Sequence, residues 1–364
     1  MNPSRPHEKT IVLGAGLMGR MLACELARQS HSVSLFDAQG SDAQGAAARV
    51  AAAMLAPLAE SAVTEKSVVQ MGQYALTRWP ALLDALQEPV FFQQSGTLIV
   101  WHRQDAAEAS RFARQLESAQ QQFPTLACAQ RVDAQQISAL EPALGSRFVQ
   151  GYFLPQEGQL DNRQLLDALL SEFERLPIDT HWHSPRALSD FHDHVGWVFD
   201  CRGLGGRADW PRLRGVRGEV IRVYAPEVTL NRPVRLIHPR YPLYIAPKPD
   251  HMYVIGATEI ESQDMSSVSV RSALELLSAT YAVHSGFAEA RIVEMSAHCR
   301  PALPDNLPAI RMLGNRRVQI NGLYRHGFLI APAMLDVVIE LVNHGTSPLA
   351  QRLGLVVENA VTAP

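Results

Sequence analysis

The first forty residues follow a pattern of short apolar runs around one helical segment. Residues 11–13 form a short apolar strand, residues 21–28 have the spacing of a helix, and residues 31–36 form a second strand. Strand, helix and strand in this order are typical of a βαβ unit, whose two strands lie parallel in one sheet. The pattern therefore predicts that the chain begins with a parallel α/β unit.

The middle of the chain follows a different pattern. Short apolar strands separated by turns with proline or aspartate occupy residues 219–257, which predicts an antiparallel sheet. Residues 90–101 have the pattern of a pair of strands around a serine–glycine turn. A helix over residues 270–284 and a strand over residues 290–298 complete the expected second unit.

The C-terminal part is predicted to return to the first unit. Residues 318–322 and 328–330 have the pattern of strands, and residues 331–343 have that of a helix. We therefore expect an α/β fold with a discontinuous Rossmann-like unit and a second unit built on a mixed, largely antiparallel β-sheet flanked by helices. The predicted division is 1–87, 150–212 and 301–364 for the Rossmann-like unit, and 88–149 and 213–300 for the second unit.

A glycine-rich turn joins the first predicted strand to the first helix. Residues 14–19 read Gly-Ala-Gly-Leu-Met-Gly, a Gly-x-Gly-x-x-Gly pattern. The first glycine permits a tight turn, the second lets backbone approach a pyrophosphate, and the third lets helix pack on strand. Asp37 ends the second strand, where a carboxylate accepts bonds from ribose hydroxyls and repels a 2′-phosphate. NAD and FAD both remain open, and a βαβ unit without a nucleotide is the alternative.

An alanine-rich segment follows this unit. Residues 46–57 read Ala-Ala-Ala-Arg-Val-Ala-Ala-Ala-Met-Leu-Ala-Pro, and alanine is both the best helix former and nearly free of side chain. The segment is either a tightly packed helix or backbone lying against something flat and large, and its position favours a cofactor. A glycine cluster at residues 203–206 follows another predicted strand, which indicates either backbone close to a ligand or a plain loop.

The composition of the chain mainly excludes classes of partner and of site. The net charge of −3 over 364 residues gives no electrostatic reason to expect nucleic acid or an anionic membrane, so a small molecule is the expected partner. The four cysteines lie far apart and the histidines show no ligand spacing, so we expect no metal site and reduced thiols in a cytoplasm. The polar N-terminus leaves no room for a secretory leader, and no run reaches the roughly 18 apolar residues of a membrane span.

Three polar residues stand among apolar strands and are candidates for a carboxylate site. They are Tyr244, Arg300 and Arg325. An arginine guanidinium binds a carboxylate with two parallel hydrogen bonds, and a tyrosine hydroxyl adds an uncharged donor. Taken singly, each of these residues is more often structural. A serine hydrolase has no support, because the chain has no Gly-x-Ser-x-Gly elbow.

These motifs together resemble the D-amino-acid oxidase family of flavoproteins, and within it the glycine oxidases of the thiamine-synthesis type. The resemblance spans about residues 10–341 and is carried by residues 14–19 with Asp37, 51–57, 299–301 and 323–332. It implies non-covalent FAD in the Rossmann-like unit and substrate in the second unit. The implied FAD-binding residues are Gly14, Ala15, Gly16, Leu17, Met18, Asp37, Ala51, Ala52, Ala53, Met54, Leu55, Gly203, His326, Gly327, Phe328, Leu329 and Ile330.

The same resemblance implies a reaction and its partners. Arg300 and Tyr244 fall where the family binds the substrate carboxylate, and Arg325 falls where a second arginine approaches it. The implied reaction is oxidative deamination of glycine or a small secondary or D-amino acid, with hydride transfer from Cα to flavin N5. Its products are an imine or 2-oxo acid, ammonia or an amine, and hydrogen peroxide from molecular oxygen. The resemblance further implies that the imine passes to a thiazole synthase for thiamine synthesis. It also implies a homo-oligomer, specifically a tetramer.

The sequence also departs from the family pattern. Asp37 stands where glutamate is usual, Arg49-Val50 stands where serine precedes the alanines, and Ala53 stands where glycine precedes methionine. The methyl group of Ala53 is expected to tighten the space over the flavin. Cys299 is the cysteine nearest the region of covalent attachment in related sarcosine oxidases, an outcome we do not expect. The alternatives are an FAD-dependent dehydrogenase that reduces a quinone and a non-enzymatic NAD-sensing Rossmann protein.

Overall fold

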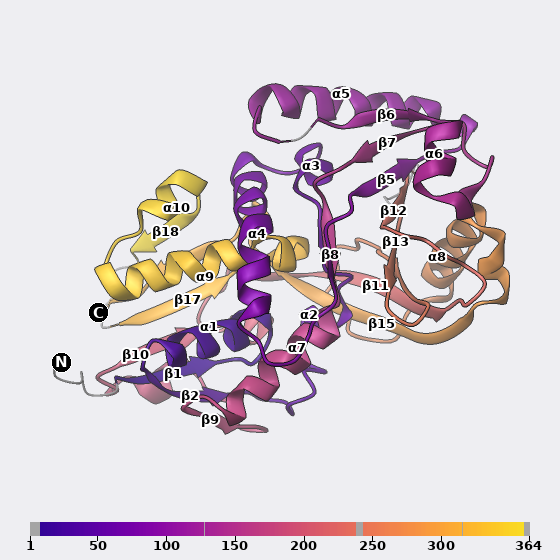
Figure 1. Cartoon of the computed structure of the whole chain (residues 1–364). Coiled ribbons are helices and arrows are strands. Elements are labelled where there is room, and N and C mark those ends of the chain that lie inside the picture. The colour runs from indigo at the N-terminus through magenta and orange to yellow at the C-terminus, as the bar shows by residue number, and fades with distance from the viewer. Residues whose placement is uncertain (1–7, 127, 238–242, 315, 360–364) are drawn as a thin grey trace.

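The computed structural model describes residues 8–126, 128–237, 243–314 and 316–359. The chain forms two large sheets and a small one, and the two large sheets lie in different parts of the molecule (Figure 1). Residues 238–242, which fall within the predicted antiparallel region, lie outside the described residues.

The first large sheet is the predicted parallel unit. Its order is β18 (Val356–Asn359), β16 (Ala309–Met312), β17 (Arg317–Asn321), β10 (Trp197–Asp200), β1 (Lys9–Leu13), β2 (Ser32–Phe36) and β9 (Ile178–His181). All neighbouring strands run parallel except β16 and β17. The inner strand β1 ends in the apolar residues Ile11, Val12 and Leu13, which are all buried, as expected for a parallel strand with both faces covered.

One apolar core joins this sheet to the short helix α10 (Pro348–Leu353) and to four longer helices. The longer helices are α1 (Leu17–Arg28), α4 (Lys66–Asp84), α7 (Asn162–Ser171) and α9 (Gly327–His344). Trp79 of α4 is buried, and its indole N–H donates to the carbonyl oxygen of Phe328 at 3.0 Å. This bond fixes the first turn of α9 against α4. The helix ends before Gly345, whose φ of 73° is the left-handed conformation that suits glycine at a helix C-terminus.

The second large sheet is mixed and largely antiparallel, as predicted. Its order is β15 (Arg291–Ala302), β11 (Arg214–Tyr224), β14 (Met252–Gly256), β13 (Leu243–Lys248), β12 (Val234–Leu236), β5 (Thr97–Val100), β7 (Gln150–Leu154) and β6 (Gln130–Asp133). Only β12 and β5 pair in parallel among these neighbours. The α/β fold with two sheets of different type is therefore confirmed.

The described chain also contains further α-helices and a small third sheet. The helices are α2 (Ala47–Val50), α3 (Pro57–Ser61), α5 (Ala106–Gln122), α6 (Ala134–Leu140) and α8 (Val270–Val283). The small sheet has the order β3 (Met54–Leu55), β8 (Gly158–Leu160) and β4 (Phe92–Gln93). In Figure 1, α5 and α6 lie with β5, β6 and β7 at one end of the second sheet, and α8 lies beside β11 and β13.

Two predictions of local structure are wrong. Residues 328–330, predicted as a strand, form the start of α9, because a short apolar run without alternation is equally compatible with a buried helix. The strand pair predicted over residues 90–101 is two strands in different sheets. β4 pairs with β8, whereas β5 pairs with β7 and β12, so the turn between β4 and β5 is not a hairpin.

The position of β7 bears on the predicted division of the chain. This strand pairs with β5 and β6 in the second sheet, although the division assigns residues 150–154 to the Rossmann-like unit. We therefore propose that the boundary predicted at residue 150 lies after Leu154.

Helix α9 and the turn before it have the length and mean hydropathy of a membrane span, although charged residues interrupt the segment, so no run of about 18 apolar residues occurs in it. Residues Tyr324–His344 reach a mean hydropathy of 1.4 over their most apolar window. Of that window, 67% is buried inside the protein, and α9 contributes to the core of the first sheet. A core helix of this kind has the same composition as a membrane helix because it is apolar on nearly every side.

Candidate functional site

A cavity of about 910 Å³ lies between the glycine turn, the alanine-rich segment and the second sheet. All the residues predicted for the cofactor and the substrate line it except Leu55 and Ile330. Those two side chains are fully buried in the core of the first sheet. The fold thus brings together segments that are up to about three hundred residues apart in the sequence, which was the main expectation for this site.

The three glycines of the turn have three different surroundings. Gly14 has a φ of 91°, and a Cβ there would come within 2.8 Å of the backbone of Arg202. A Cβ on Gly19 would overlap the carbonyl oxygen of Gly14, so glycine is required for α1 to pack on β1. A Cβ on Gly16 would meet nothing closer than the Ala46 Cβ at 3.7 Å. Gly16 therefore presents open backbone to the cavity, as a diphosphate site requires.

Asp37 is bonded to this turn. Its Oδ2 accepts from the backbone N–H of Ala15 at 2.5 Å, and its Oδ1 accepts from that of Gln39 at 2.7 Å. Both Asp37 and Ala15 line the cavity. The carboxylate at the end of β2 thus fixes the backbone of the glycine turn and faces the space beside it.

The alanine-rich segment is only partly helical. We refer to residues 46–54 as the alanine loop. Residues 47–50 form the single turn α2, after which Ala51 is extended, with φ −60° and ψ 152°. Ala53 has a φ of 51°, in the left-handed region that L-residues adopt at a cost. The helix alternative therefore holds for four residues, and the rest of the loop lies along the cavity wall.

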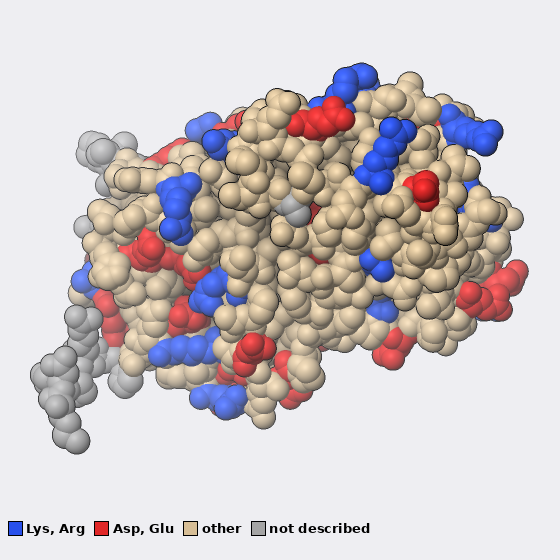
Figure 2. All heavy atoms as spheres, turned by 45° about the horizontal axis from the view of Figure 1, so that its top comes forward, with Lys and Arg blue, Asp and Glu red and all other residues tan. Residues whose placement is uncertain are grey.

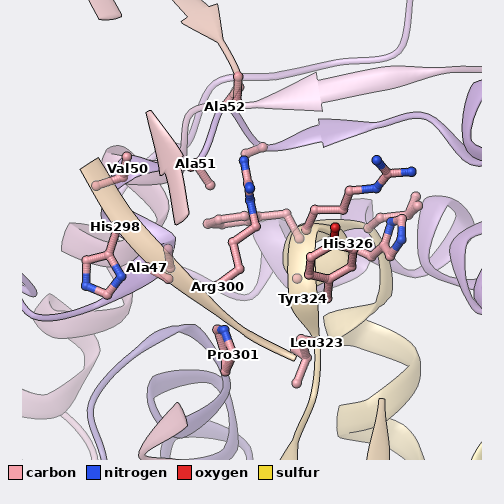
Figure 3. A pocket seen from close by; sticks show the side chains of 18 of the residues that line it. Ala47, Val50, Ala51, Ala52, His298, Arg300, Pro301, Leu323, Tyr324 and His326 are labelled. Carbon is pink, nitrogen blue, oxygen red and sulfur yellow. The ribbon is translucent and has the colours of Figure 1, made fainter. Parts of the chain in front are cut away.

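One face of the second sheet forms the opposite wall. In the sheet register Arg300 lies opposite Val216, while Tyr244 lies opposite both Gly256 and Arg235. Residues opposite one another on neighbouring strands project from the same face. The side chains that reach the cavity from this face include Arg235, Tyr244, His298 and Arg300. In Figure 3, Arg300 lies between Ala47 and Ala51 on one side and Tyr324 and His326 on the other.

Arg300 is held by backbone rather than by an acid. Its Nη2 donates to the carbonyl oxygen of Thr258 at 3.1 Å, and its Nη1 donates to that of Arg217 at 3.4 Å. Within the described part of the chain it forms no ion pair with a carboxylate. Burial raises the pKa of the nearby Tyr244 hydroxyl, which therefore stays protonated and able to donate. The two groups suit an anionic ligand.

Arg325, in contrast, is already paired. Its Nη2 lies 3.0 Å from Glu60 Oε2, and its Nη1 lies 3.0 Å from Glu259 Oε2. Arg235 also approaches Glu60, with Nη1 3.4 Å from Oε1. Burial alone would raise the pKa of Glu60, but the guanidinium groups of Arg325 and Arg235 lower it to about 2. The carboxylate is therefore ionised and neutralised by its neighbours.

His326 borders the same cluster. Its Nδ1 lies 3.7 Å from Glu60 Oε2, and its side chain is 3% exposed. Burial lowers the pKa of His326 to about 4, so the ring is neutral near pH 7. Sequence reasoning placed Arg325 and His326 at the site but missed Glu60, Arg235 and Glu259. These three come from separate segments, and no local pattern marks them.

Two further predicted features can be located. Gly203 has a φ of 56°, lines the cavity, and its carbonyl oxygen accepts from Asn321 at 2.9 Å. The Cys299 thiol donates to the carbonyl oxygens of Ser262 and Asp264 at 3.6 Å, and burial raises its pKa. A protonated, bonded thiol is a poor nucleophile. In the described ranges, no group of three or more His, Cys, Asp or Glu residues is arranged to hold a metal ion.

One face of the molecule carries both signs of charge. On the face drawn in Figure 2, acidic and basic side chains are interspersed among uncharged ones, and neither sign forms a continuous field. Charged side chains also lie in the cavity wall, where Glu60 and Glu259 pair with Arg325.

Comparison with protein families gives a match over nearly the whole chain. The model described as DAO, FAD dependent oxidoreductase, matches residues 9–341. A protein of Rhizobium etli named as a thiamine biosynthesis oxidoreductase, ThiO, is 41% identical over 330 residues, which cover 91% of this chain and 95% of that protein. A bifunctional ThiO/ThiG protein of Synechocystis is 23% identical over 60% of this chain and 36% of its own length.

Solved structures share the fold at low sequence identity. Glycine oxidase from Bacillus cereus superposes with a TM-score of 0.78 at 19% identity, covering 93% of this chain and 96% of that one. Iminodiacetate oxidase from Chelativorans superposes with a TM-score of 0.77 at 18% identity, covering 96% and 100%. At these identities the likeness concerns the fold, and the chemistry must be argued from the residues of the site.

Proposed function

Because this chain belongs to the DAO family of FAD-dependent oxidoreductases, we propose that it oxidises glycine or a small secondary or D-amino acid with molecular oxygen. The enzyme class and the cofactor, FAD, follow from the family match and the ThiO relative. The substrate, the acceptor and the pathway are the proposal. The observation that carries it is Arg300, a cavity arginine bonded only to carbonyl oxygens, beside the protonated hydroxyl of Tyr244.

The residues of the cavity suit FAD. Open backbone at Gly16 and the carboxylate of Asp37 suit the diphosphate and the adenosine ribose. The alanine loop offers a nearly side-chain-free surface for the flat ring system, and the first turn of α9, at residues 327–329, adds N–H groups that have no partner within the helix. We propose that these segments hold the cofactor without a covalent bond. The hydrogen bonds of the Cys299 thiol to two carbonyl oxygens favour this, because they make the thiol a poor nucleophile.

The substrate carboxylate is proposed to bind Arg300 and Tyr244. A guanidinium without an acidic partner gains most from a carboxylate, because a charge-assisted pair replaces weaker bonds to neutral carbonyls. Arg325 is bound to Glu60 and Glu259, so we propose that it shapes the cavity wall beside the substrate. Among the described residues Arg300 has no carboxylate partner, which suits it to bind the carboxylate of a substrate.

The protein's part in the reaction is positioning. Bound FAD supplies the redox chemistry by taking two electrons from the substrate and returning them to oxygen as hydrogen peroxide. Arg300 and Tyr244 fix the carboxylate and thereby the direction of the Cα–H bond, and the buried walls exclude water. The oxidised product is an imine, which hydrolyses to a 2-oxo acid and ammonia or an amine.

The cellular role is proposed from the relatives. The ThiO name of the Rhizobium etli relative and the bifunctional ThiO/ThiG protein favour a role in thiamine synthesis, with hand-off of the imine to a thiazole synthase. A homotetramer and a cytoplasmic location remain predictions from the family resemblance and from the separate cysteines. A dehydrogenase that reduces a quinone is the competing function.

An oxygen-uptake panel tests the proposal. Purified protein reconstituted with FAD is assayed with glycine, sarcosine, and small D- and L-amino acids, and peroxide is measured with oxygen as sole acceptor. We expect uptake with glycine or sarcosine and one peroxide per oxygen. Uptake with none of these amines would refute the substrate class, and turnover only with an added quinone would establish the competing function.

A variant of Arg300 tests the carboxylate site. Arg300→Gln removes a charged partner, and we expect KM to rise about tenfold to a hundredfold while FAD stays bound. Arg212→Gln, at an exposed arginine, is the matched control. An unchanged KM in Arg300→Gln would remove Arg300 from the site.

A further inference from the structure

A buried ammonium group supports the alanine loop from behind. Lys248 ends β13, four residues after Tyr244, and its side chain is almost fully buried. Its Nζ donates to the carbonyl oxygen of Ala52 at 2.9 Å, to that of Leu160 at 2.7 Å, and to Gln159 Oε1 at 3.1 Å. All three ammonium protons are thus bonded, each to a neutral oxygen.

A buried amide holds the beginning of the same loop. Asn162, at the start of α7, is fully buried, and its Nδ2 donates to the carbonyl oxygens of Ala48 and Arg49, both at 2.8 Å. Its Oδ1 accepts from Nη2 of the buried Arg222 at 2.6 Å. The orientation of the amide is therefore fixed from β11.

Burying the charged ammonium group of Lys248 costs free energy that a purely structural role does not require. Burial lowers the pKa of Lys248 to about 7, so the protonated form is disfavoured where it lies. The charged groups near the ammonium are Asp161, which favours its charge, and Arg222, which opposes it. A neutral apolar residue of similar size avoids the cost of burying a charge. A buried charge where an apolar residue would be more stable is expected mainly at functional positions.

The contacts are also concentrated on one stretch of backbone. Three carbonyl oxygens of the alanine loop, at Ala48, Arg49 and Ala52, accept bonds from two side chains. Between them lie Val50 and Ala51, which line the cavity. Alanine side chains offer little area for packing, so backbone bonds from neighbouring elements must supply the order that side chains supply elsewhere.

We infer that Lys248 and Asn162 are positioning residues that hold the alanine loop in the shape that packs against FAD before the cofactor binds. The inference rests on the proposed function in placing the FAD ring system at this loop. A loop that is ordered in the free protein loses less conformational entropy on binding, so FAD binds more tightly. Neither side chain is required to touch the substrate.

Two variants release the two ends of the loop. Lys248→Met keeps the length of the side chain and removes all three donors. Asn162→Asp keeps the oxygen that accepts from Arg222 and removes the donor to Ala48 and Arg49, so it tests the inference even where Lys248→Met fails to fold. Lys9→Met, at an exposed lysine of β1, is the matched control.

Three measurements read the effect. Hydrogen–deuterium exchange of the peptide spanning residues 46–54 is followed in the apoprotein, FAD affinity is taken from the quenching of flavin fluorescence, and visible circular dichroism reports the surface packed on the flavin. We expect at least about tenfold faster exchange in the loop, an FAD Kd raised about tenfold, and an altered flavin dichroism, with Lys9→Met unchanged. We also expect kcat to fall with KM unchanged, because Arg300 stays in place.

The outcomes separate this inference from the proposed function. Wild-type exchange and wild-type FAD affinity in both loop variants would overturn the inference, whatever the substrate is. The titration needs no amine, so a protein that binds FAD but oxidises none of the tested amines still tests the loop. Faster exchange at residues 46–54 together with weaker FAD binding supports it.

Discussion

The guanidinium group of Arg300 lies directly over Gly218 of the neighbouring strand β11. A Cβ built on Gly218 would overlap Nη1, Nη2 and Cζ of Arg300. The same relationship recurs one strand further, where a Cβ on Gly256 would lie 2.7 Å from the Tyr244 hydroxyl oxygen. Arg300 and Tyr244, the two proposed carboxylate ligands, therefore each occupy space beside a glycine of the neighbouring strand, where any other residue would place a Cβ.

The first prediction follows from that contact. Gly218→Ala adds one methyl group where the guanidinium lies, so Arg300 must move while its charge is retained. We expect KM for the amine substrate to rise about tenfold or more and FAD binding to persist, because the glycine turn is untouched. Steady-state kinetics with oxygen uptake measure KM, and the absorbance of bound flavin measures FAD binding.

A control is needed because glycine substitutions in strands change stability. Gly314→Ala lies at a turn where a Cβ meets nothing within 4 Å, although its φ of 73° makes it strained in the same sense as other left-handed glycines. It should lower thermal stability without raising KM. Equal KM values for Gly218→Ala and the wild type would mean that Arg300 does not need its observed position.

The parts of the site that could be predicted are those with local signals. The glycine turn at residues 14–19 follows from backbone requirements that only a few residue types meet. Arg300 could be proposed because a charged residue stands at the end of an apolar strand. Such features can be found from a few neighbouring residues, and the two-sheet architecture from the change of apolar period along the chain.

The remainder depends on contacts that a single segment does not encode. Glu60, which pairs with Arg325, lies in a five-residue helix with no motif, and Lys248 ends an apolar strand at a position that a surface lysine would also occupy. The separation of β4 from β5 is likewise decided by their partners β8 and β7. Long-range pairing, rather than propensity, determines these features.

The second prediction concerns Asp37. Asp37→Ala removes the acceptor of the Ala15 N–H and the proposed partner of the ribose, so both the glycine turn and the cofactor lose a bond. We expect the Kd of FAD to rise about tenfold to a hundredfold. Activity lost on dilution should return when FAD is added. Titration of apoprotein with FAD measures the change, and Asp84→Ala, at an exposed aspartate, is the control.

Asp37→Glu provides the converse test. Glutamate restores the carboxylate with one more methylene group, so it should recover most of the FAD affinity that Asp37→Ala loses. An Asp37→Ala protein with the affinity of the wild type would show that the carboxylate is not part of the cofactor site.

The third prediction is a pH dependence of stability. The pKa of His326 is about 4 in the folded protein against 6.5 for an exposed histidine, because burial of the ring and the nearby Arg325 lower the pKa by more than Glu60 and Glu259 raise it. The unfolded state therefore binds the proton first, and stability falls as the pH is lowered from 6.5 towards 4. His326→Gln cannot take up this proton.

Urea unfolding at pH values between 7 and 5 measures the effect. We expect the wild type to lose about 1 kcal/mol more than His326→Gln for each pH unit below 6.5. Glu60 contributes little in this range, because its pKa of about 2 lies well below it. Parallel pH profiles for the two proteins would show that His326 is protonated as readily in the folded state as in the unfolded chain.

The last prediction uses the one position where the alanine loop departs both from the family pattern and from ordinary backbone geometry. Ala53 has a φ of 51°, which costs an L-residue roughly 1–2 kcal/mol and costs glycine almost nothing. Ala53→Gly relieves this strain but also loses a buried methyl group and increases the freedom of the unfolded chain.

Ala52→Gly has the same two losses without the relief, because Ala52 has no positive φ and is equally buried. The free energy of unfolding of Ala53→Gly should therefore exceed that of Ala52→Gly by about 1–2 kcal/mol. Denaturant unfolding of both apoproteins measures the difference, and equal values would mean that the loop relaxes out of the left-handed conformation in solution.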